Sequence, residues 1–211
     1  MKRIALMGLF SAILVGGAFV VAQPAGSAGA SSQSQSAASG RALTINRAQQ
    51  QVRRYMRQYG NPHLVIDEIM EFQHNFYAIV KDTSTGHGAF EVLVNKRSGL
   101  VFPEYGPAMM WNTQYGMMGG RTTGGGMMGN GSSRGPMTVS SAHAAGIARQ
   151  WLARYRPGTT GETPDQFPGY YTVHLHKSGT ITGMLSVNGY SGRVWYHNWH
   201  GKFIHLQKVN G

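Results

Sequence analysis

The stretch VNKRSGLVF at residues 94–102 returns as VNGYSGRVW at residues 187–195. Each copy opens with Val-Asn, carries Ser-Gly in its middle and closes with a Val followed by an aromatic residue. Asn95 and Asn188 therefore stand at a fixed offset of 93 residues (188 − 95). Two copies of one turn at a constant spacing indicate a tandem duplication, so the structural unit is a repeat of about 65 to 75 residues.

The repeated stretch has the composition of a β-hairpin. Val-Asn ends a strand, and a tight turn follows in which Gly99 or Gly192 supplies a positive φ. The Val-aromatic pair then starts the next extended segment. Each copy therefore predicts a hairpin near the end of its repeat.

A second match lies upstream of each hairpin. Residues 44–59 (TINRAQQQVRRYMRQY) and 140–155 (SSAHAAGIARQWLARY) align so that their apolar residues share one face of a helix. Thr44 and Ser140 are the expected N-caps. Each unit is therefore expected to begin with an amphipathic helix.

Segments of alternating polarity follow each helix and predict strands with one buried and one solvated face. The expected strands cover residues 64–72, 75–82, 88–95 and 100–102 in the first unit, and residues 170–177, 181–188 and 193–199 in the second. We therefore predict an α+β fold of two repeated units, each with one helix packed on an antiparallel sheet of three to four strands. Units of this size are marginal alone, so the two copies should share a core.

The repeated pattern resembles a known family. A helix beginning Ser/Thr-x-x-x-Ala, then antiparallel strands and an x-x-x-[ST]-G-x-[VI] hairpin, is similar to the PepSY (peptidase propeptide and YpeB-like) domain. The hairpins NKRSGLV and NGYSGRV differ from the family, which more often has an Asp and a Thr before the Gly. The resemblance covers most of residues 43–203 apart from a central insert. It implies a non-catalytic module, exported or membrane-associated, that binds or restrains a peptidase or another envelope protein.

The first residues of the chain have the anatomy of an export signal. Lys2 and Arg3 precede an uncharged apolar run at residues 4–22, and small residues follow with Ala-x-Ala at residues 28–30. We predict a signal peptide over residues 1–30 and a periplasmic or extracellular location. The apolar run is close to the roughly 20 residues that span a bilayer, so an uncleaved inner-membrane anchor is the alternative. A disordered spacer is expected at residues 31–42.

Composition narrows the function further. The chain has no cysteine, which excludes disulfides, thiolate metal sites and cysteine nucleophiles. A net charge of +11 suggests nucleic acid only for a cytoplasmic protein, and an exported chain meets acidic lipids, glycans or proteins instead. There is no HExxH, GxSxG, Walker or GxGxxG motif, and the eight carboxylates form no assignable acid–base pair. We expect neither catalysis nor a nucleic-acid partner.

The two units, at residues 43–106 and 137–206, are separated by a Met/Gly-rich segment at residues 107–136, which we expect to be a linker without regular structure. Thioether sulfur is a soft ligand that suits Cu(I), so methionine pairs in this segment could close around a copper ion. The candidate ligands are Met117, Met118, Met127 and Met128. The alternative is a flexible linker whose methionines provide an adaptable contact surface.

Histidines and aromatic residues gather in the second unit. His174 and His176 share one face of an expected strand, and with His197 or His200 they could bind zinc or copper. The alternative is that these histidines decorate a half-exposed surface. Large apolar side chains near the hairpin ends are the candidates for partner contact. They are Met109, Met110, Trp111 and Trp199.

Two functional hypotheses follow from these patterns. The first is an exported binding module that presents its hairpin ends and Met-rich insert to a peptidase or another envelope protein. The second is a periplasmic copper-binding protein that uses the Met-rich insert and the C-terminal histidines.

Overall fold

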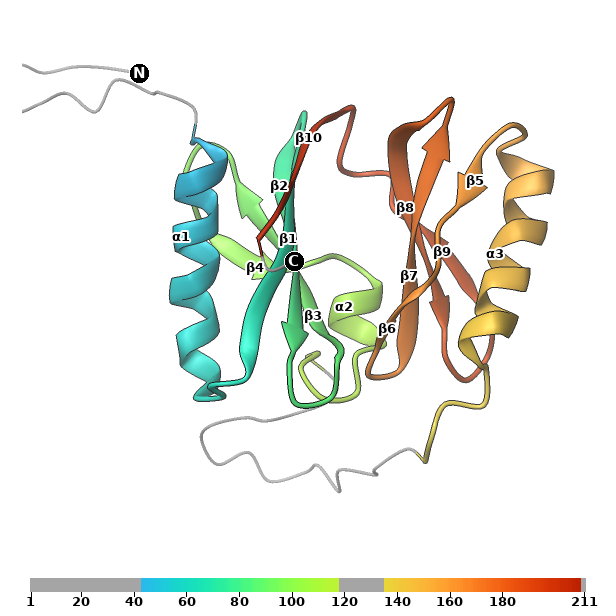
Figure 1. Ribbon diagram of the computed structural model, residues 1–211, viewed down its shortest axis with the longest axis horizontal. Coiled ribbons are helices and arrows are strands. Elements are labelled where there is room, and N and C mark those ends of the chain that lie inside the picture. Colours follow the sequence, from blue (N-terminus) through green and yellow to red (C-terminus); the bar gives the residue numbers. More distant parts are fainter. Residues whose placement is uncertain (1–42, 118–134, 210–211) are drawn as a thin grey trace, which may run out of the picture. The chain divides into compact units, whose positions relative to one another are not determined.

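The computed structural model describes residues 43–117 and 135–209, which fold into two antiparallel sheets, each covered by one long helix (Figure 1). The strand order is β10-β1-β2-β3-β4 in the first sheet and β5-β7-β8-β9 in the second, where β6 also pairs with β7. The predicted α+β class with two repeated units is confirmed. Each sheet has five strands, one more than the expected upper bound.

The elements of the two repeats follow one another in the same order. The first repeat contains α1 (Ile45–Met56), η1 (Arg57–Tyr59), β1 (Leu64–Phe72), β2 (Asn75–Asp82), β3 (His87–Asn95) and β4 (Val101–Pro103), and is followed by α2 (Pro107–Met110). The second contains α3 (Ser141–Tyr155), β5 (Thr160–Gly161), β6 (Asp165–Phe167), β7 (Tyr170–Lys177), β8 (Thr180–Asn188) and β9 (Val194–Tyr196), and is followed by β10 (Phe203–Lys208).

The two long helices begin and pack as their sequences predict. The side chains of Thr44 and Ser140 accept hydrogen bonds from backbone N–H groups three residues later, at 3.4 and 3.2 Å. These bonds satisfy N–H groups that have no partner within the helix. The apolar face of each helix is buried against its own sheet, through Ala48, Val52 and Met56 in α1 and through Ala144, Ala148 and Leu152 in α3.

The two hairpin turns are equivalent in detail. In each turn the Asn side-chain oxygen, of Asn95 or Asn188, accepts backbone N–H groups two and three residues later at 2.9 to 3.0 Å. Gly99 and Gly192 have φ angles of 70° and 68°, which side chains rarely adopt. The duplicated stretch is therefore the same structure twice.

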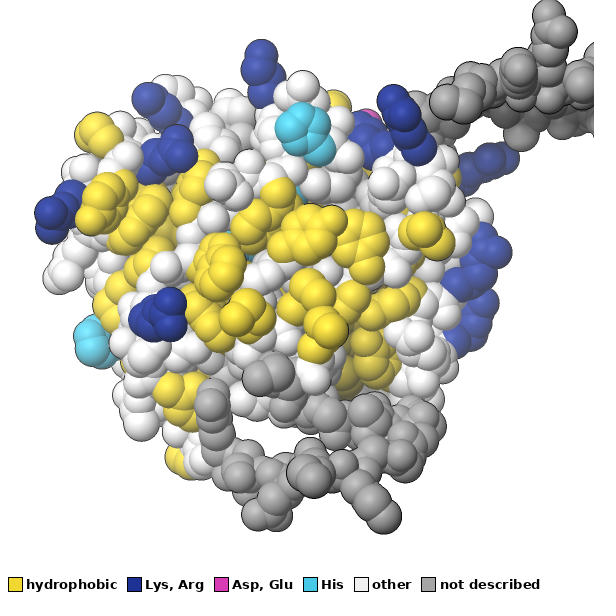
Figure 2. All heavy atoms as spheres, turned by 180° about the vertical axis from the view of Figure 1, so that it is seen from behind, with side chains coloured by type: hydrophobic (Ala, Val, Ile, Leu, Met, Phe, Trp, Pro, Cys, Tyr) yellow, Lys and Arg dark blue, Asp and Glu magenta, His cyan; other side chains and the backbone are white. Residues whose placement is uncertain are grey.

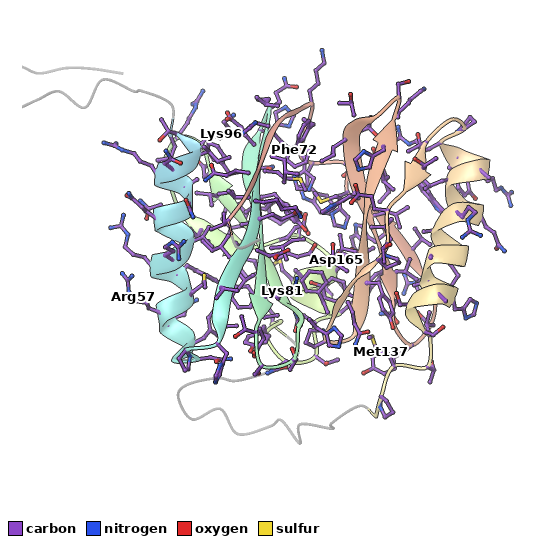
Figure 3. All side chains as sticks on the ribbon, in the orientation of Figure 1. Arg57, Phe72, Lys81, Lys96, Met137 and Asp165 are labelled. Atoms are coloured by element: carbon purple, nitrogen blue, oxygen red, sulfur yellow. The ribbon has the colours of Figure 1, made fainter. Side chains whose placement is uncertain are left out.

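The buried side chains form three layers. One lies between α1 and the first sheet, one between α3 and the second sheet, and the third joins the inner faces of the two sheets. Phe72 lies in this inner layer, whereas Arg57 points away from the sheet on the outer side of α1 (Figure 3). The two repeats thus share a core, and the inner layer is where they meet.

The predicted boundaries of the second unit, residues 137–206, need a correction. β10 pairs antiparallel with β1, from Glu68 opposite Lys208 to Phe72 opposite Phe203, and so belongs to the first sheet. Phe203 and Leu206 pack against the inner layer. Burial of these side chains explains why the chain crosses back to the first repeat. The strand expected at residues 193–199 is also shorter, because the chain leaves the sheet after Tyr196.

The predicted linker, residues 107–136, needs a correction as well. Its first part forms α2 and a turn in which Ala108 and Trp111 are buried. The Asn112 amide donates to the Ala89 carbonyl at 2.8 Å, which anchors this turn to β3. Residues 107–117 therefore belong to the folded unit, because their apolar side chains cover the inner layer.

Several predictions lie outside the described residues. They are the signal peptide at residues 1–30, the spacer at residues 31–42, and the methionines at 118, 127 and 128. Between residues 43 and 117 and between 135 and 209, no helix is long and apolar enough to cross a membrane.

Candidate functional site

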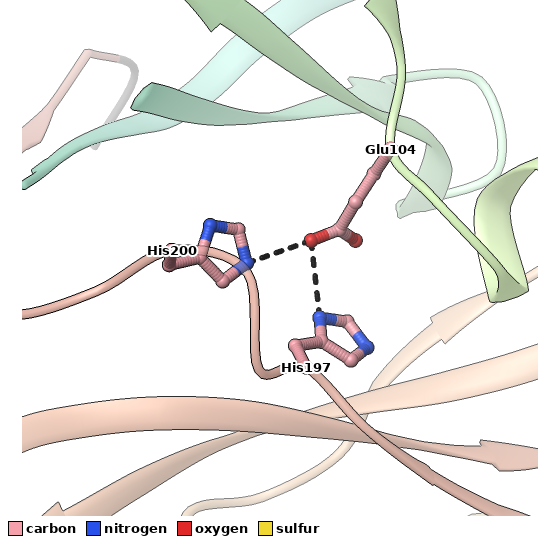
Figure 4. Close-up of side chains that lie close together, drawn as sticks. All are labelled: Glu104, His197 and His200. Carbon is pink, nitrogen blue, oxygen red and sulfur yellow. Dashed lines mark hydrogen bonds and ion pairs between the residues drawn. The ribbon is translucent and has the colours of Figure 1, made fainter. Parts of the chain in front are cut away.

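A cluster of polar side chains is buried in the otherwise apolar inner layer. Glu104 follows β4, and His197 and His200 follow β9; none of the three is more than 2% exposed. One carboxylate oxygen of Glu104, Oε1, lies 3.0 Å from His197 Nδ1 and 2.9 Å from His200 Nε2 (Figure 4). A single acidic oxygen from the first repeat therefore contacts two imidazoles from the second.

The backbone places Glu104 and His197 at equivalent positions. They are 93 residues apart, which is the offset between the two hairpins. Their backbone N–H groups donate to the carbonyls of Glu91 and Met184, both at 3.0 Å. At the ends of β4 and β9, this hydrogen bond holds the backbone so that the side chain of Glu104 or His197 points toward the other repeat. The same repeat position carries an acid in one copy and an imidazole in the other.

The far sides of both imidazoles are also hydrogen-bonded. His197 Nε2 lies 2.9 Å from Ser186 Oγ, which lies 3.0 Å from Thr172 Oγ1. His200 Nδ1 lies 2.9 Å from Asn75 Oδ1. These contacts fix the orientation of each ring, so the nitrogens that face Glu104 have little rotational freedom.

A second buried carboxylate, Glu91, lies beside this cluster. It accepts hydrogen bonds from the hydroxyls of Tyr77 and Tyr170, the latter at 2.7 Å. Burial raises the pKa of Glu91 to about 7, and the charge of Glu104 adds to this shift. Burial likewise raises the pKa of both tyrosine hydroxyls well above the ordinary value. Both tyrosines therefore remain hydrogen-bond donors.

The titration of the cluster is governed by the contact between Glu104 and His197. Burial alone would raise the pKa of Glu104, but the charge of His197 and hydrogen bonds from both imidazoles lower this pKa to about 2. Burial alone would lower the pKa of His197, and Glu104 raises it overall. Burial lowers the pKa of His200. These directions describe an ion pair between the repeats, with a neutral His200 beside it.

The predicted pair His174 and His176 forms a different cluster around Glu162. His174 Nε2 lies 3.3 Å from Glu68 Oε1 and its Nδ1 lies 3.6 Å from Glu162 Oε2, while His176 Nε2 lies 2.6 Å from Glu162 Oε1. Glu68 also pairs with Lys208 of β10. Burial works against protonation of His174, but Glu162 and Glu68 raise its pKa overall.

The histidines predicted to share one metal site are thus divided between two clusters. Of the described His, Asp and Glu side chains, only Glu104, His197 and His200 bring three ligand atoms within 4.8 Å of one another. Neither His174 nor His176 joins them. Among the described His, Asp and Glu side chains, the best placed metal candidates are therefore Glu104, His197 and His200.

An apolar surface lies above the buried cluster. Leu100, Tyr105 and Met110 are 68, 46 and 55% exposed. Leu100 precedes β4, the edge strand of the first sheet, Tyr105 follows it, and Met110 ends α2. The Tyr105 ring contacts Trp199 at 5.8 Å, and Trp199 stacks on the ring of the buried His197 at 4.8 Å. Figure 2 shows apolar side chains gathered over one face of the molecule. We call Leu100, Tyr105, Met110 and Trp199 the edge surface.

The residues predicted for partner contact divide between this surface and the core. Met110 is exposed, and Met109 and Trp199 are half-buried. Trp111 needs a correction, because it is only 9% exposed and its ring packs edge-on against Trp195 at 5.8 Å. Its indole fills the space between α2 and β9, which leaves little of it for a partner.

Sequence reasoning missed the central residues of the buried cluster. Glu91 and Glu104 were present only as carboxylates without an assigned role, and Tyr77 and Tyr170 were seen only as strand residues. One signal could have found part of the cluster: extending the 93-residue offset of the hairpins aligns Glu104 with His197.

No protein-family model matches this sequence, and no curated protein sequence does so. Among solved structures, the fold is similar to the Bacillus megaterium YpeB C-terminal domain, with 13% sequence identity and a TM-score of 0.26. The match covers 74% of this chain and 62% of that chain, so less than two thirds of that structure is represented. The similarity is distant and assigns no function.

Proposed function

We propose that the chain is an exported, non-catalytic binding module of PepSY type that engages another envelope protein, with a peptidase as the first candidate. The observation that supports this proposal is the edge surface. Three of its side chains, Leu100, Tyr105 and Met110, are about half or more exposed although they are large and apolar. Exposed apolar groups that lie together on a folded protein are typical of interaction sites.

The position of the edge surface favours contact with an extended segment. β4 and β9 are end strands of the two sheets, and such strands have backbone groups free to pair with another chain. Aromatic rings beside an edge strand add apolar contact area at a low entropic cost. Lys and Arg side chains lie at the margins of the apolar face in Figure 2, which favours an acidic partner. We therefore expect an apolar segment with acidic flanks.

Site-specific crosslinking tests this proposal. A photoreactive amino acid at Tyr105 should produce one discrete adduct in the native cell envelope, because Tyr105 is exposed and contacts Trp199 within the edge surface. The matched control is Gln50, which is exposed on the outer side of α1. The adducted protein, once purified, should bind wild type at least about tenfold more tightly than Tyr105→Ala, as expected for a central aromatic contact.

Two outcomes would contradict the proposal. The first is an equal yield of the same adduct from Gln50, since it would make the capture unspecific. The second is unchanged affinity of the purified partner for Tyr105→Ala.

The copper hypothesis stays a prediction. Met117 is 71% exposed, and the other three candidate methionines lie outside the described residues. Cu(I) titration of wild type against a variant with Leu at all four candidate methionines separates the two hypotheses, because Leu keeps the apolar volume and removes the sulfur. Stoichiometric binding lost in the variant would support copper, and no binding by wild type would exclude it.

A further inference from the structure

The buried cluster between the repeats brings together the ligand atoms of a metal site. His197 Nδ1, His200 Nε2 and Glu104 Oε1 lie within 4.8 Å of one another, with the oxygen 3.0 and 2.9 Å from the two nitrogens. Two atoms that each bind zinc at about 2.0–2.2 Å lie roughly 3.3–3.6 Å apart in tetrahedral geometry. The spacing is a few tenths of an ångström shorter, so an ion would bind with a small outward shift of the ring nitrogens.

His200 is held by a contact at each ring nitrogen. The Asn75 amide nitrogen donates to the Trp199 carbonyl at 3.4 Å, so the Asn75 oxygen faces His200 Nδ1 at 2.9 Å. A metal-bound imidazole carries one ring proton, which Nδ1 would donate to this oxygen. Nε2 would then offer its lone pair to an ion shared with the Glu104 oxygen 2.9 Å away.

Glu104 itself has unused ligand capacity. Its second oxygen, Oε2, is buried and has no hydrogen-bond partner among the described side chains. Leaving such an oxygen without a partner is costly in a protein interior. Glu91 adds a second fully buried carboxylate nearby. A bound cation offsets the negative charge and can take Oε2 as a further ligand.

The surroundings of both histidines are those of metal ligands. In metal sites, the ring nitrogen that does not bind the ion is usually hydrogen-bonded, which orients the ring. Ser186 has this position behind His197, and Asn75 has it behind His200. The ligand atoms and their supporting contacts are therefore both in place.

We infer that Glu104, His197 and His200 bind one divalent transition-metal ion, for which Zn²⁺ is the closest match. Imidazole nitrogens and a carboxylate oxygen are typical ligands of zinc, whereas soft thioether sulfur suits Cu(I). The ligands are almost fully buried and come from both repeats, so the ion joins the repeats as a structural site. The three ligands include no residue of the edge surface, so the two proposals can be tested separately.

Metal uptake by the full chain tests this inference. After treatment with a chelator, wild type should bind one Zn²⁺ per chain, measured by calorimetry and elemental analysis, and its melting temperature should rise with Zn²⁺ concentration. Glu104→Gln and His200→Gln should each weaken uptake at least tenfold. The matched control is His176→Gln, which removes an imidazole from the other cluster and should leave uptake unchanged. Absence of stoichiometric uptake by wild type, or loss of uptake only in His176→Gln, would overturn the inference.

A second measurement on wild type does not depend on the folding of any variant. Imidazole nitrogen NMR should show His200 protonated at Nδ1, and Zn²⁺ should shift the resonances of His200 Nε2 and His197 Nδ1. If these resonances do not change when Zn²⁺ is in excess, the cluster is a hydrogen-bonded network only and the inference is wrong.

Discussion

In the first repeat the chain leaves its last hairpin strand through Glu104, and in the second it leaves through His197. Both backbones make the same hydrogen bond to the neighbouring strand, at 3.0 Å in each copy. The side chains differ, and they contact one another across the inner layer. A duplicated fold can bury charge in this way: where the two copies of one position meet, an acid in one copy and a base in the other stabilise each other.

A tyrosine from each repeat meets the same layer in a different way. Tyr77 of β2 and Tyr170 of β7 both donate to Glu91, although they are not equivalent: Tyr77 lies opposite Leu93, whereas Tyr170 lies opposite Asn188. The position equivalent to Glu91 is Met184 (91 + 93), which is apolar and completely buried. A single carboxylate therefore accepts from a tyrosine of each repeat, so polar groups need not be duplicated to be satisfied.

Making the two equivalent positions alike should have the largest effect. His197→Glu places a carboxylate against Glu104 and beside Glu91, and it removes the positive partner of a buried pair. We expect the free energy of unfolding to fall by about 3–5 kcal/mol, measured by urea denaturation. The control is the reciprocal double variant Glu104→His with His197→Glu, which restores an acid and a base and should recover most of the loss. Equal destabilisation of the single and double variants would contradict the charge complementarity.

Removing the two tyrosine hydroxyls should have the next largest effect. Tyr77→Phe and Tyr170→Phe each remove a hydrogen bond to the buried Glu91, so each should lower the free energy of unfolding by about 2 kcal/mol. Tyr171→Phe is the control, because the Tyr171 hydroxyl donates to a neutral carbonyl at 2.8 Å and should be worth about 1 kcal/mol. If only one of the two variants is destabilised, the two hydroxyls do not share Glu91.

The hairpin glycines should show a smaller effect that differs between the copies. Alanine at a positive φ costs about 1 kcal/mol, so Gly99→Ala and Gly192→Ala should both lower the melting temperature. Gly192→Ala should cost more, since its new Cβ lies 3.0 Å from Ile147 Cδ1, whereas the Cβ at position 99 has 3.6 Å to its nearest neighbour. Gly146→Ala, in open space on α3, is the control and should not destabilise. Unchanged melting of both hairpin variants would mean that the turns tolerate a side chain.

The smallest expected effect concerns pH. His174 lies opposite Met184 in the second sheet and Ile79 lies opposite Glu91 in the first, so an ionisable imidazole stands where the other copy has an apolar side chain. The pKa of His174 is raised above 6.5, because Glu162 and Glu68 outweigh burial. Because folding raises this pKa, protonated His174 stabilises the folded state. This stabilisation is complete below pH 6.5 and is lost as pH rises through the folded-state pKa.

His174→Gln should therefore lower the melting temperature more at pH 5.5 than at pH 8. The other charged groups that face this histidine are Asp165, His176 and Lys208, and they are present in both proteins, so the difference isolates His174. Lys81→Gln is the control, and its effect should be independent of pH over this range. A pH-independent effect of His174→Gln would contradict the predicted titration.

Much of the fold could be predicted from local patterns. The bounds of β1, β2 and β7 match the expected strands residue for residue, because their alternating side chains end at turn residues. β10 was missed, since its partner β1 lies more than 100 residues earlier and no local pattern reports such a pairing. α2 was missed because four apolar residues in a Met/Gly-rich context have no periodicity to detect.

The candidate site could not be predicted in the same way. Periodicity indicates which residues of a strand share a face, but it does not say which faces of two repeats meet. The contact of Glu104 with His197 and His200 exists only because the inner faces of both sheets pack together. His174 and His176 were correctly placed on one strand, yet their partner Glu162 comes from the loop before β6.

The pairing of β10 with β1 has a consequence for when this protein can fold. Glu68 and Lys208 are partners although 140 residues separate them along the chain. A chain that emerges in order from the ribosome offers β1 well before β10. The first sheet therefore remains one strand short until both repeats have emerged, and its open edge must stay unpaired until then.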